Sequence, residues 1–331
     1  MSKWLIFLGL FFMPPAISAE LAELKKYHFS EAHLGTDVHL VFYSDSPEQA
    51  EALAQRCFQR VQALDAVLSD YQSHSELSQL CRKPIGKAHP VSKDLFAVIA
   101  RAQQISCLSH GAFDITMGKA SHSWRARRLS KPVPKDHANQ GSEMVSFRDV
   151  GLVAEQRLVT LRKTMRLDLG GIGKGYIADQ VMLVLKKADV THAAVIIGGE
   201  TLLADAPPGK TGWRIGIENP EHQIIGTLDL ANTAVSTSGD SYQFFEVEGE
   251  RESHLIDPAT RRSKTNRLNV VTIARSSMLA DAWATALRVL PTSEARDLAD
   301  QQPGIEALFI PYRQATSGTK HFPKLAVPEK N

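Results

Sequence analysis

The segment Asp168-Leu169-Gly170-Gly171-Ile172-Gly173-Lys174-Gly175-Tyr176 constrains the fold of this chain more than any other. Apolar and polar residues alternate from Met165 to Leu169 and predict a strand, whereas the periodic apolar residues from Ile177 to Leu185 predict a helix. Glycines allow backbone N–H groups to approach a ligand closely, and a helix N-terminus attracts anions. With the positive charge of Lys174, this strand–turn–helix unit is typical of a phosphate or pyrophosphate site.

The segment matches neither common phosphate loop. A Walker loop needs four residues between its first glycine and the Gly-Lys pair, followed by Ser or Thr. Here Gly170 lies only three residues before Gly173, and Gly175 follows the lysine. The dinucleotide fingerprint Gly-x-Gly-x-x-Gly is absent from this segment as well. A tight strand-to-helix turn with an exposed lysine is therefore the alternative interpretation.

Composition excludes some classes of function. The 331 residues are 43% hydrophobic and carry a net charge of +2, which is ordinary for a globular protein with a large core. No basic run with interleaved aromatic residues indicates nucleic-acid binding.

Residues 1–19 are typical of a secretory signal peptide. Lys3 precedes a short apolar run, and small residues follow up to a predicted cut after Ser18 or Ala19. The alternative is a membrane anchor, but the run is shorter than the about 20 residues that a membrane span needs. We therefore expect an exported, periplasmic protein with no transmembrane span in the mature chain.

The three cysteines Cys57, Cys81 and Cys107 leave two possibilities. An exported protein can pair two of them and leave one over, or all three can be small buried apolar residues. Their spacing matches no metal site.

Periodicity predicts an α+β fold, with a helix-rich first half and a strand-rich second half. We expect a surface loop at 129–142 and a loose tail at 314–331, so that the main domain spans 20–313. The predicted helices are 46–68, 73–80 (with a capping box at Ser73), 92–109, 277–290 and 293–301. The predicted strands are 39–43, 193–197, 213–217, 227–230, 234–237, 242–247, 254–256, 270–274 and 307–310.

Two further motifs carry candidate chemistry. Asp281 and Thr285 are four residues apart, so a helix places their oxygens on one face, where they suit Mg²⁺. The alternative is that Asp281 favours the helix dipole and Thr285 bonds to a backbone carbonyl. His254 is a candidate proton acceptor, although Asp257 and Thr260 alternatively close an Asx turn beside an exposed histidine.

The order of these motifs resembles the ApbE family over residues 33 to 310. The resemblance is carried by eight ordered segments: Gly35-Thr36-Asp37, Leu68–Leu77, Gly111–Thr116, the glycine-lysine segment, Gly198-Gly199-Glu200, Ser236–Asp240, His254–Thr260 and Ala280–Thr285. Members of this family are FAD:protein FMN transferases. The resemblance implies a periplasmic, Mg²⁺-dependent enzyme with a T-fold-like α+β architecture. It would cleave FAD, release AMP and attach FMN to a threonine of a flavin-acceptor subunit of a membrane redox complex.

The resemblance also implies roles for individual residues. FAD would contact Leu34, where the family commonly has methionine, and the metal would be held by the Gly171 carbonyl, Asp281 and Thr285. Lys174 would stabilise the charge of the pyrophosphate. From the chemistry of the reaction, the threonine nucleophile also needs a proton acceptor, for which His254 and Asp257 are the candidates; we prefer His254, because its imidazole adjoins the flavin-contact position Ile256. The remaining FAD contacts would be Tyr71, Ala112, Phe113, Asp114, Lys174 and Ile256.

Three departures from the family pattern fall near the expected site. Gln243 stands where an arginine is common, and Arg261 stands where a glycine usually follows Asp-Pro-x-Thr, a loss that we expect to change the turn. Lys119 replaces a usual proline. These departures motivate an alternative function, a periplasmic protein that binds or hydrolyses FAD without transferring FMN. A third possibility is a partner-binding or assembly protein.

Overall fold

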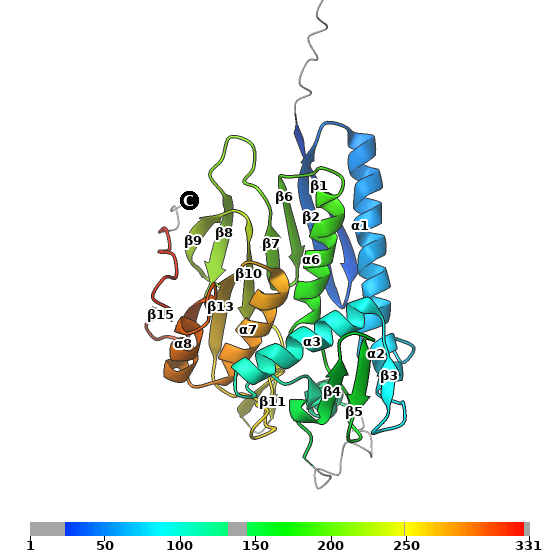
Figure 1. Cartoon of the computed structure of the whole chain (residues 1–331). Coiled ribbons are helices and arrows are strands. Elements are labelled where there is room, and N and C mark those ends of the chain that lie inside the picture. Colours follow the sequence, from blue (N-terminus) through cyan, green and yellow to red (C-terminus); the bar gives the residue numbers. More distant parts are fainter. Residues whose placement is uncertain (1–23, 132–143, 248, 328–331) are drawn as a thin grey trace, which may run out of the picture.

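The computed structural model describes residues 24–131, 144–247 and 249–327 (Figure 1). Its helices are α1 (Pro47–Leu68), α2 (Glu76–Leu80), α3 (Lys93–Leu108), α4 (Gly118–Arg128), α6 (Gly173–Lys186), α7 (Ser277–Val289) and α8 (Thr292–Asp300), with short 3₁₀ turns at Ile115–Met117 and Phe147–Asp149. Its strands are β1 (Lys25–His33), β2 (Thr36–Ser44), β3 (Ala88–Pro90), β4 (Val150–Val153), β5 (Leu158–Leu161), β6 (Ala193–Ile197), β7 (Glu200–Leu203), β8 (Trp213–Glu218), β9 (Ile224–Leu230), β10 (Thr233–Ser238), β11 (Phe244–Val247), β12 (Glu250–Ser253), β13 (Leu268–Ala274), β14 (Glu306–Pro311) and β15 (Ser317–Gly318).

One eight-stranded sheet organises the molecule. Its order is β1-β2-β6-β7-β10-β13-β14-β15, and every neighbouring pair is antiparallel. A three-stranded sheet (β3-β5-β4) and the hairpins β8-β9 and β11-β12 complete the strands. Helices and antiparallel strands occur in blocks, which confirms the predicted α+β class.

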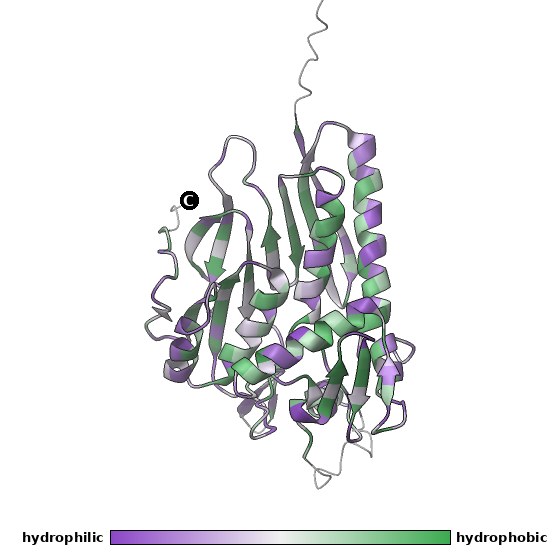
Figure 2. Ribbon diagram, viewed as in Figure 1, coloured by the Kyte–Doolittle hydropathy of each residue, from purple (hydrophilic) through white to green (hydrophobic). Residues whose placement is uncertain are grey.

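The two faces of the large sheet have different covers. Helices α1, α6 and α7 pack on one face (Figure 1), where their apolar sides turn inward (Figure 2). The β8-β9 hairpin packs on the opposite face through Ile217 and Leu228, against Val235 and Val271 of the sheet. Neighbouring Ala234 and Val270 belong instead to the helical core, as the alternation of side chains along a strand requires.

The sequence signals for the long helices are confirmed. Pro47 begins α1 behind the cap residue Ser46, whose hydroxyl accepts a hydrogen bond from the backbone N–H of Gln49 at 3.3 Å. Ser92 caps α3 in the same way through the N–H of Leu95 at 3.2 Å. Both helices bury their apolar faces in the main core.

Two strand predictions were wrong. Residues 165–169 form no strand: Leu167 N–H donates to the Cys81 sulfur and Asp168 N–H to the carbonyl of Ile115, so no strand ladder develops. Their alternation predicted burial correctly, because Met165, Leu167 and Leu169 are all buried. Residues 254–256 also lie beyond a strand, since β12 ends at Ser253 and only an isolated bridge joins Ile256 to Ser263.

Two helix predictions need correction. The cap of α2 is Ser75, whose hydroxyl accepts from the Ser78 N–H at 3.0 Å, so the helix begins later than the capping box at Ser73 indicated. Helix α4 was not predicted, because Gly118–Arg128 is too polar to show an apolar period. Most of the expected 129–142 loop lies outside the described residues.

The C-terminal segment is more ordered than expected. Within residues 314–327, β15 pairs with β14, and Ala326 exchanges backbone hydrogen bonds with Thr227 of β9. The proposed signal peptide, residues 1–19, lies outside the described residues. In the described part of the chain, no helix combines the length and apolarity that crossing a membrane requires.

The three cysteines are unpaired. Cys57 is buried within the core of α1, as the small-apolar interpretation predicted. Cys107 is exposed, so this interpretation does not extend to it.

Candidate functional site

The glycine segment forms a turn that leads directly into α6. Gly170, Gly171 and Ile172 make the turn, and α6 begins at Gly173. A Cβ atom on Gly175 would lie 2.3 Å from the backbone oxygen of Ser277, so only glycine allows α6 to cross the start of α7 this closely. This crossing brings the turn and α7 together.

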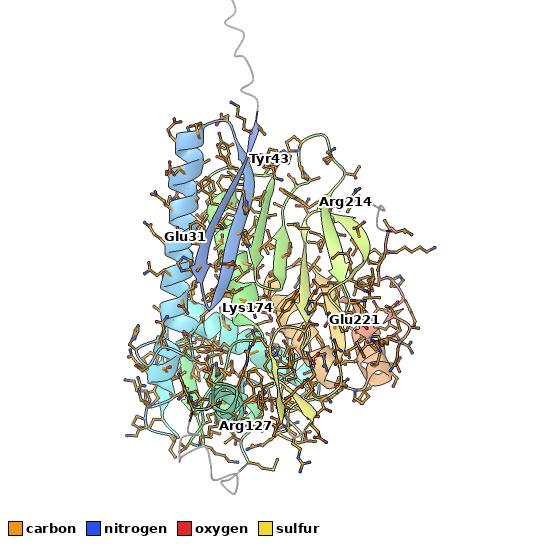
Figure 3. The ribbon with its side chains drawn as sticks, turned by 180° about the vertical axis from the view of Figure 1, so that it is seen from behind. Glu31, Tyr43, Arg127, Lys174, Arg214 and Glu221 are labelled. Atoms are coloured by element: carbon orange, nitrogen blue, oxygen red, sulfur yellow. The ribbon has the colours of Figure 1, made fainter. Side chains whose placement is uncertain are left out.

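Lys174 lies between two buried carboxylates, near the centre of the molecule (Figure 3). Its Nζ atom donates to the Gly170 carbonyl at 2.8 Å and lies 3.5 Å from Oε1 of Glu200 and 3.9 Å from Oδ1 of Asp281. Glu200 is 3% and Asp281 2% exposed, whereas 30% of the Lys174 side chain remains exposed. The ammonium group therefore neutralises buried charge while keeping access to solvent.

Burial and mutual charge shift the pKa values of these groups. Burial, followed by the nearby charge of Asp281, raises the pKa of Glu200 to about 8. Burial also raises the pKa of Asp281. Burial alone would lower the pKa of Lys174, but the carboxylates of Asp281 and Glu200 outweigh it and hold this pKa above its usual value. Lys174 is thus firmly cationic, and the raised pKa of Glu200 favours its protonated form more than in a free glutamate.

Asp281 and Thr285 both face the glycine segment, as their spacing predicted. Oδ2 of Asp281 accepts from the Gly175 N–H at 3.0 Å. The position that a Cβ atom would take on Gly171 lies 2.9 Å from Oγ1 of Thr285 and 3.3 Å from the ring of Phe113, so a side chain there would displace Thr285.

The donor set around Gly171 fits Mg²⁺. It consists of oxygen atoms only, a buried carboxylate, a hydroxyl and a backbone carbonyl, which are the ligands that this cation prefers. Oε2 of Glu200 is also buried without a hydrogen-bond partner. Across the described ranges, no three His, Cys, Asp or Glu side chains form a metal-binding group. Any metal here would therefore depend on the mixed oxygen set.

A second charged network, formed by Asp168, Arg125 and Asp70, contacts the glycine turn. Asp168 accepts the N–H of Gly170 at 2.8 Å and the hydroxyl of Ser121 at 2.5 Å, and it lies 3.6 Å from Arg125. Arg125 also pairs with Asp70. Burial and the charge of Asp168 raise the pKa of Asp70 to about 6, while Arg125 holds the pKa of Asp168 below its usual value against the effect of burial.

His254 is held as a neutral base. Its Nδ1 lies 3.1 Å from the carbonyl oxygen of Gln243, which can only accept, so Nδ1 carries the hydrogen and Nε2 keeps its lone pair. Burial lowers the pKa of His254 to about 4, and the positive charges of Lys174 and Arg288 act in the same direction. The edge of Trp124 packs against the imidazole, with ring centroids 6.1 Å apart.

Asp257 closes the turn that follows His254. Its Oδ1 accepts the N–H groups of Ala259 and Thr260 at 2.9 and 3.3 Å, and its Oδ2 lies 3.7 Å from Lys264. This is the Asx turn named above as the alternative. Arg261 in the same turn has φ 57°, a conformation that favours glycine, so the backbone keeps the shape that a glycine would take.

A buried carboxylate joins α7 to the β11-β12 hairpin. Asp240 pairs with Nε of Arg251 at 2.6 Å and lies 3.7 Å from Nη2 of the fully buried Arg288. Arg251, from the hairpin, thus supplies a guanidinium group to the turn in which Gln243 replaces the usual arginine.

The remaining predicted residues come from several other segments of the chain. Leu34 is in the β1-β2 turn. Thr36, which follows this turn, approaches Gly198: its Oγ1 lies 3.3 Å from the position that a Cβ atom would take on that glycine. Tyr71 is 76% exposed, and Ile256 is partly buried. Ala112 and Phe113 are buried. Asp114 turns inward, because its carboxylate accepts from Thr116 and from the N–H of Phe147 at 2.9 Å.

The structure therefore brings Lys174 and Asp281 within 3.9 Å of one another and places Thr285 and Phe113 beside Gly171 of the same glycine segment. It shows no direct contact between His254 and Lys174. Two members of the site were not predicted from the sequence. Glu200 lies beside Lys174, and Asp168 accepts a hydrogen bond from the N–H of Gly170. A carboxylate directly after the glycine pair at a strand end was the available signal for Glu200.

Known proteins are similar to this chain in sequence and in fold. The chain is 28% identical over 299 residues to an FAD:protein FMN transferase of Klebsiella pneumoniae, which covers 88% of this chain and 90% of that protein. It is 30% identical over 310 residues to an FAD:protein FMN transferase of Treponema pallidum, with 87% and 85% covered.

Solved structures agree with this similarity. The apo form of the flavinyl transferase ApbE of Pseudomonas stutzeri superposes with a TM-score of 0.79 at 28% identity, covering 91% of this chain and 96% of that one. The ApbE protein of Thermotoga maritima gives 0.80 at 25% identity, with 89% and 97% covered. The model of the ApbE family matches residues 34–309, and the chain therefore belongs to the ApbE family.

Proposed function

We propose that this chain transfers FMN from FAD to a threonine hydroxyl of a target protein, in a Mg²⁺-dependent reaction that releases AMP. The observation that carries the proposal is Lys174 beside the buried Asp281, with Thr285 and Gly171 in contact next to them. A cation and an oxygen-lined metal position over a glycine turn suit a pyrophosphate. The transferase activity named for the relatives fits the same ligand.

Lys174 would stabilise the negative charge of the pyrophosphate. Its ammonium group is permanently charged at neutral pH and partly open to solvent, so it can reach a phosphate oxygen without leaving the turn. Asp281, Thr285 and the Gly171 carbonyl would hold Mg²⁺, which supplies further charge stabilisation to the phosphates when bound.

His254 would accept the proton of the target hydroxyl at Nε2. The threonine oxygen forms a bond to the phosphorus of the FMN half, and the bond from that phosphorus to the bridging oxygen breaks, so that AMP leaves with this oxygen. The hydroxyl proton moves to Nε2, which has a lone pair because Nδ1–H donates to Gln243. Asp257 is the weaker candidate for this role, because its oxygens are used in its own turn.

The partner and location follow from the same proposal. The acceptor would be a flavin-carrying subunit of a membrane redox complex, and the enzyme would act in the periplasm after removal of residues 1–19. Both rest on the family resemblance and the signal-like N-terminal sequence.

One assay tests the function. The purified protein is incubated with FAD, MgCl₂ and an acceptor domain that contains one target threonine, and mass spectrometry measures FMN on the acceptor. We expect FMN on the threonine and an equal amount of AMP, and no label on a Thr→Val acceptor. AMP without label would identify an FAD hydrolase, and neither product would indicate a binding or assembly protein.

The base assignment has its own test. We expect His254→Ala to lower the transfer rate by about 10²- to 10⁴-fold, the usual contribution of a general base. A variant that transfers FMN at the wild-type rate would remove His254 from this role.

A further inference from the structure

Arg125 joins two parts of the site that the mechanism treats separately. This α4 side chain is 17% exposed. Its guanidinium group pairs with Asp70, lies 3.6 Å from Asp168, and covers the ring of Tyr71 with Cζ 4.2 Å from the ring centroid. The Asp70 carboxylate accepts through both oxygens, so the plane of the guanidinium group is fixed.

Tyr71 presents an unusual surface. Its ring is 76% exposed, although a large aromatic side chain gains free energy from burial. One face of the ring is stacked on Arg125, which is anchored by the neighbouring Asp70. Stacking on an anchored cation restricts the ring without covering its other face. The result is an oriented aromatic platform that is open to a flat ligand.

The same guanidinium reaches the glycine turn through Asp168. Asp168 accepts the Gly170 N–H at 2.8 Å, and the Gly170 carbonyl accepts from Nζ of Lys174 at 2.8 Å. A short series of contacts therefore runs from Tyr71 through Arg125, Asp168 and Gly170 to Lys174. This series fixes the position of the aromatic platform relative to the cation that would face the pyrophosphate.

We propose that Arg125 is a positioning residue that holds the Tyr71 ring as a stacking surface for a planar heterocycle of FAD, in register with Lys174. This proposal rests on the proposed function for the presence of FAD in the site. Arg125 itself need not touch the dinucleotide, because it acts through Tyr71 and Asp168.

The test measures FAD binding without turnover. FAD is titrated in EDTA, and quenching of flavin fluorescence gives the Kd. Arg125→Lys keeps a positive charge beside the two carboxylates but removes the planar group that stacks on Tyr71. We expect the Kd to rise about tenfold, within the range of a cation–π contact. Separate calorimetric titrations with FMN and with AMP, which has no flavin fluorescence, show which heterocycle stacks, since only that half should bind more weakly.

Arg127→Lys is the matched control. Arg127, labelled in Figure 3, lies on the same helix, pairs with Glu252 at 2.8 Å and covers Phe245 at 5.4 Å, but contacts neither Tyr71 nor Asp168. We expect its Kd for FAD to stay within about twofold of wild type. Asp70→Asn is a milder second variant that keeps Arg125 and its contact with Asp168. It should raise the Kd about threefold through a less firmly held guanidinium.

A double-mutant cycle decides between positioning and general damage to the fold. Tyr71→Ala should weaken FAD binding, and Arg125→Lys should add little in the Tyr71→Ala background. An undiminished effect in that background would overturn the proposal, as would wild-type affinity of Arg125→Lys or an equal loss for FMN and AMP. Wild-type FAD affinity of Tyr71→Ala would overturn it too, while leaving FMN transfer, and so the proposed function, intact.

Discussion

Two buried charge clusters of opposite composition involve helix α7, one through Asp281 in its first half and the other through Arg288 near its end. In the first, one cation, Lys174, lies between the carboxylates of Glu200 and Asp281. In the second, one carboxylate, Asp240, lies between the guanidinium groups of Arg251 and Arg288. Both clusters remove charge from water, so the difference lies in how far their cations are exposed and in where those cations donate hydrogen bonds.

The second cluster directs its hydrogen bonds to the backbone. Arg288 donates to the Leu268 carbonyl at 2.7 Å and to Asn266, and Arg251 donates to the carbonyl of Asp240 at 2.6 Å. Each cluster has one buried carboxylate oxygen without a hydrogen-bond partner, Oε2 of Glu200 in the first and Oδ1 of Asp240 in the second. The cations differ, because 30% of the Lys174 side chain is exposed, whereas Arg288 is fully buried and Arg251 is 15% exposed. A buried cluster whose cations are enclosed and donate to the backbone holds elements together, whereas one whose cation reaches solvent is suited to a ligand.

The largest effect that this comparison predicts is on activity. Asp281→Asn removes the negative charge of the proposed metal position but keeps the shape of the side chain. We expect Mg²⁺-dependent FMN transfer to fall by at least about 10²-fold, since metal and charge stabilisation contribute several kcal/mol. Transfer is measured over a series of Mg²⁺ concentrations, with thermal denaturation to show that the fold is retained. Wild-type turnover at low Mg²⁺ would contradict the metal assignment.

The second cluster should affect stability instead. Arg288→Met leaves the buried Asp240 carboxylate with one cation fewer and the buried Leu268 carbonyl without its donor, so we expect the free energy of unfolding to fall by about 3–5 kcal/mol. Arg251→Met should cost about 1–2 kcal/mol because its side chain is 15% exposed. Urea denaturation measures both. Losses below about 1 kcal/mol in both variants would show that the cluster is not structural.

A further difference between the clusters concerns the dependence of stability on pH. Because the folded state raises the pKa of Glu200 from 4.5 to about 8, it holds a proton that the unfolded chain releases above pH 4.5. The free energy of unfolding of the wild type therefore carries a contribution that falls as pH rises from about 4.5 to 8, by at most about 1.4 kcal/mol per pH unit.

Glu200→Gln cannot titrate and so lacks this contribution. We expect the variant to become progressively more stable than the wild type between pH 5 and pH 8, in metal-free buffer with EDTA. Urea denaturation at each pH gives the difference directly. Parallel curves for the two proteins would mean that folding does not raise the pKa of Glu200, and the first cluster would then have no pH dependence of its own.

Local signals account for what the sequence could predict. Helices α1 and α3 show an apolar period and a serine cap, and the four-residue spacing of Asp281 and Thr285 placed both on the face that meets the glycine turn. The alternation in residues 165–169 predicted burial but not hydrogen-bond partners, because these come from Cys81 and Ile115.

Contacts between distant segments account for what the sequence could not predict. Glu200 reaches Lys174 only because β7 and α6 pack together, and no local pattern encodes that contact. Arg125 of α4 joins Asp70 and Asp168. This helix is too polar to show an apolar period in the sequence. Such networks depend on topology, whereas caps and faces depend on near neighbours.

The smallest predicted effect concerns Arg261, where the comparison can be extended to a third cation. Its Nη2 donates to the Val145 carbonyl at 2.9 Å, as the arginines of the second cluster donate to backbone carbonyls, although its Nε is buried without a hydrogen-bond partner. Within the described ranges it forms no ion pair, so we group it with the structural arginines. Arg261→Gly relieves the backbone at φ 57° but loses this hydrogen bond and makes the unfolded chain more flexible. These contributions oppose one another, so we expect the free energy of unfolding to change by less than about 1 kcal/mol. FMN transfer should stay near the wild-type rate. A loss of transfer greater than about tenfold at unchanged stability would place Arg261 with Lys174 instead, and would show that bonding to the backbone does not by itself mark a residue as structural.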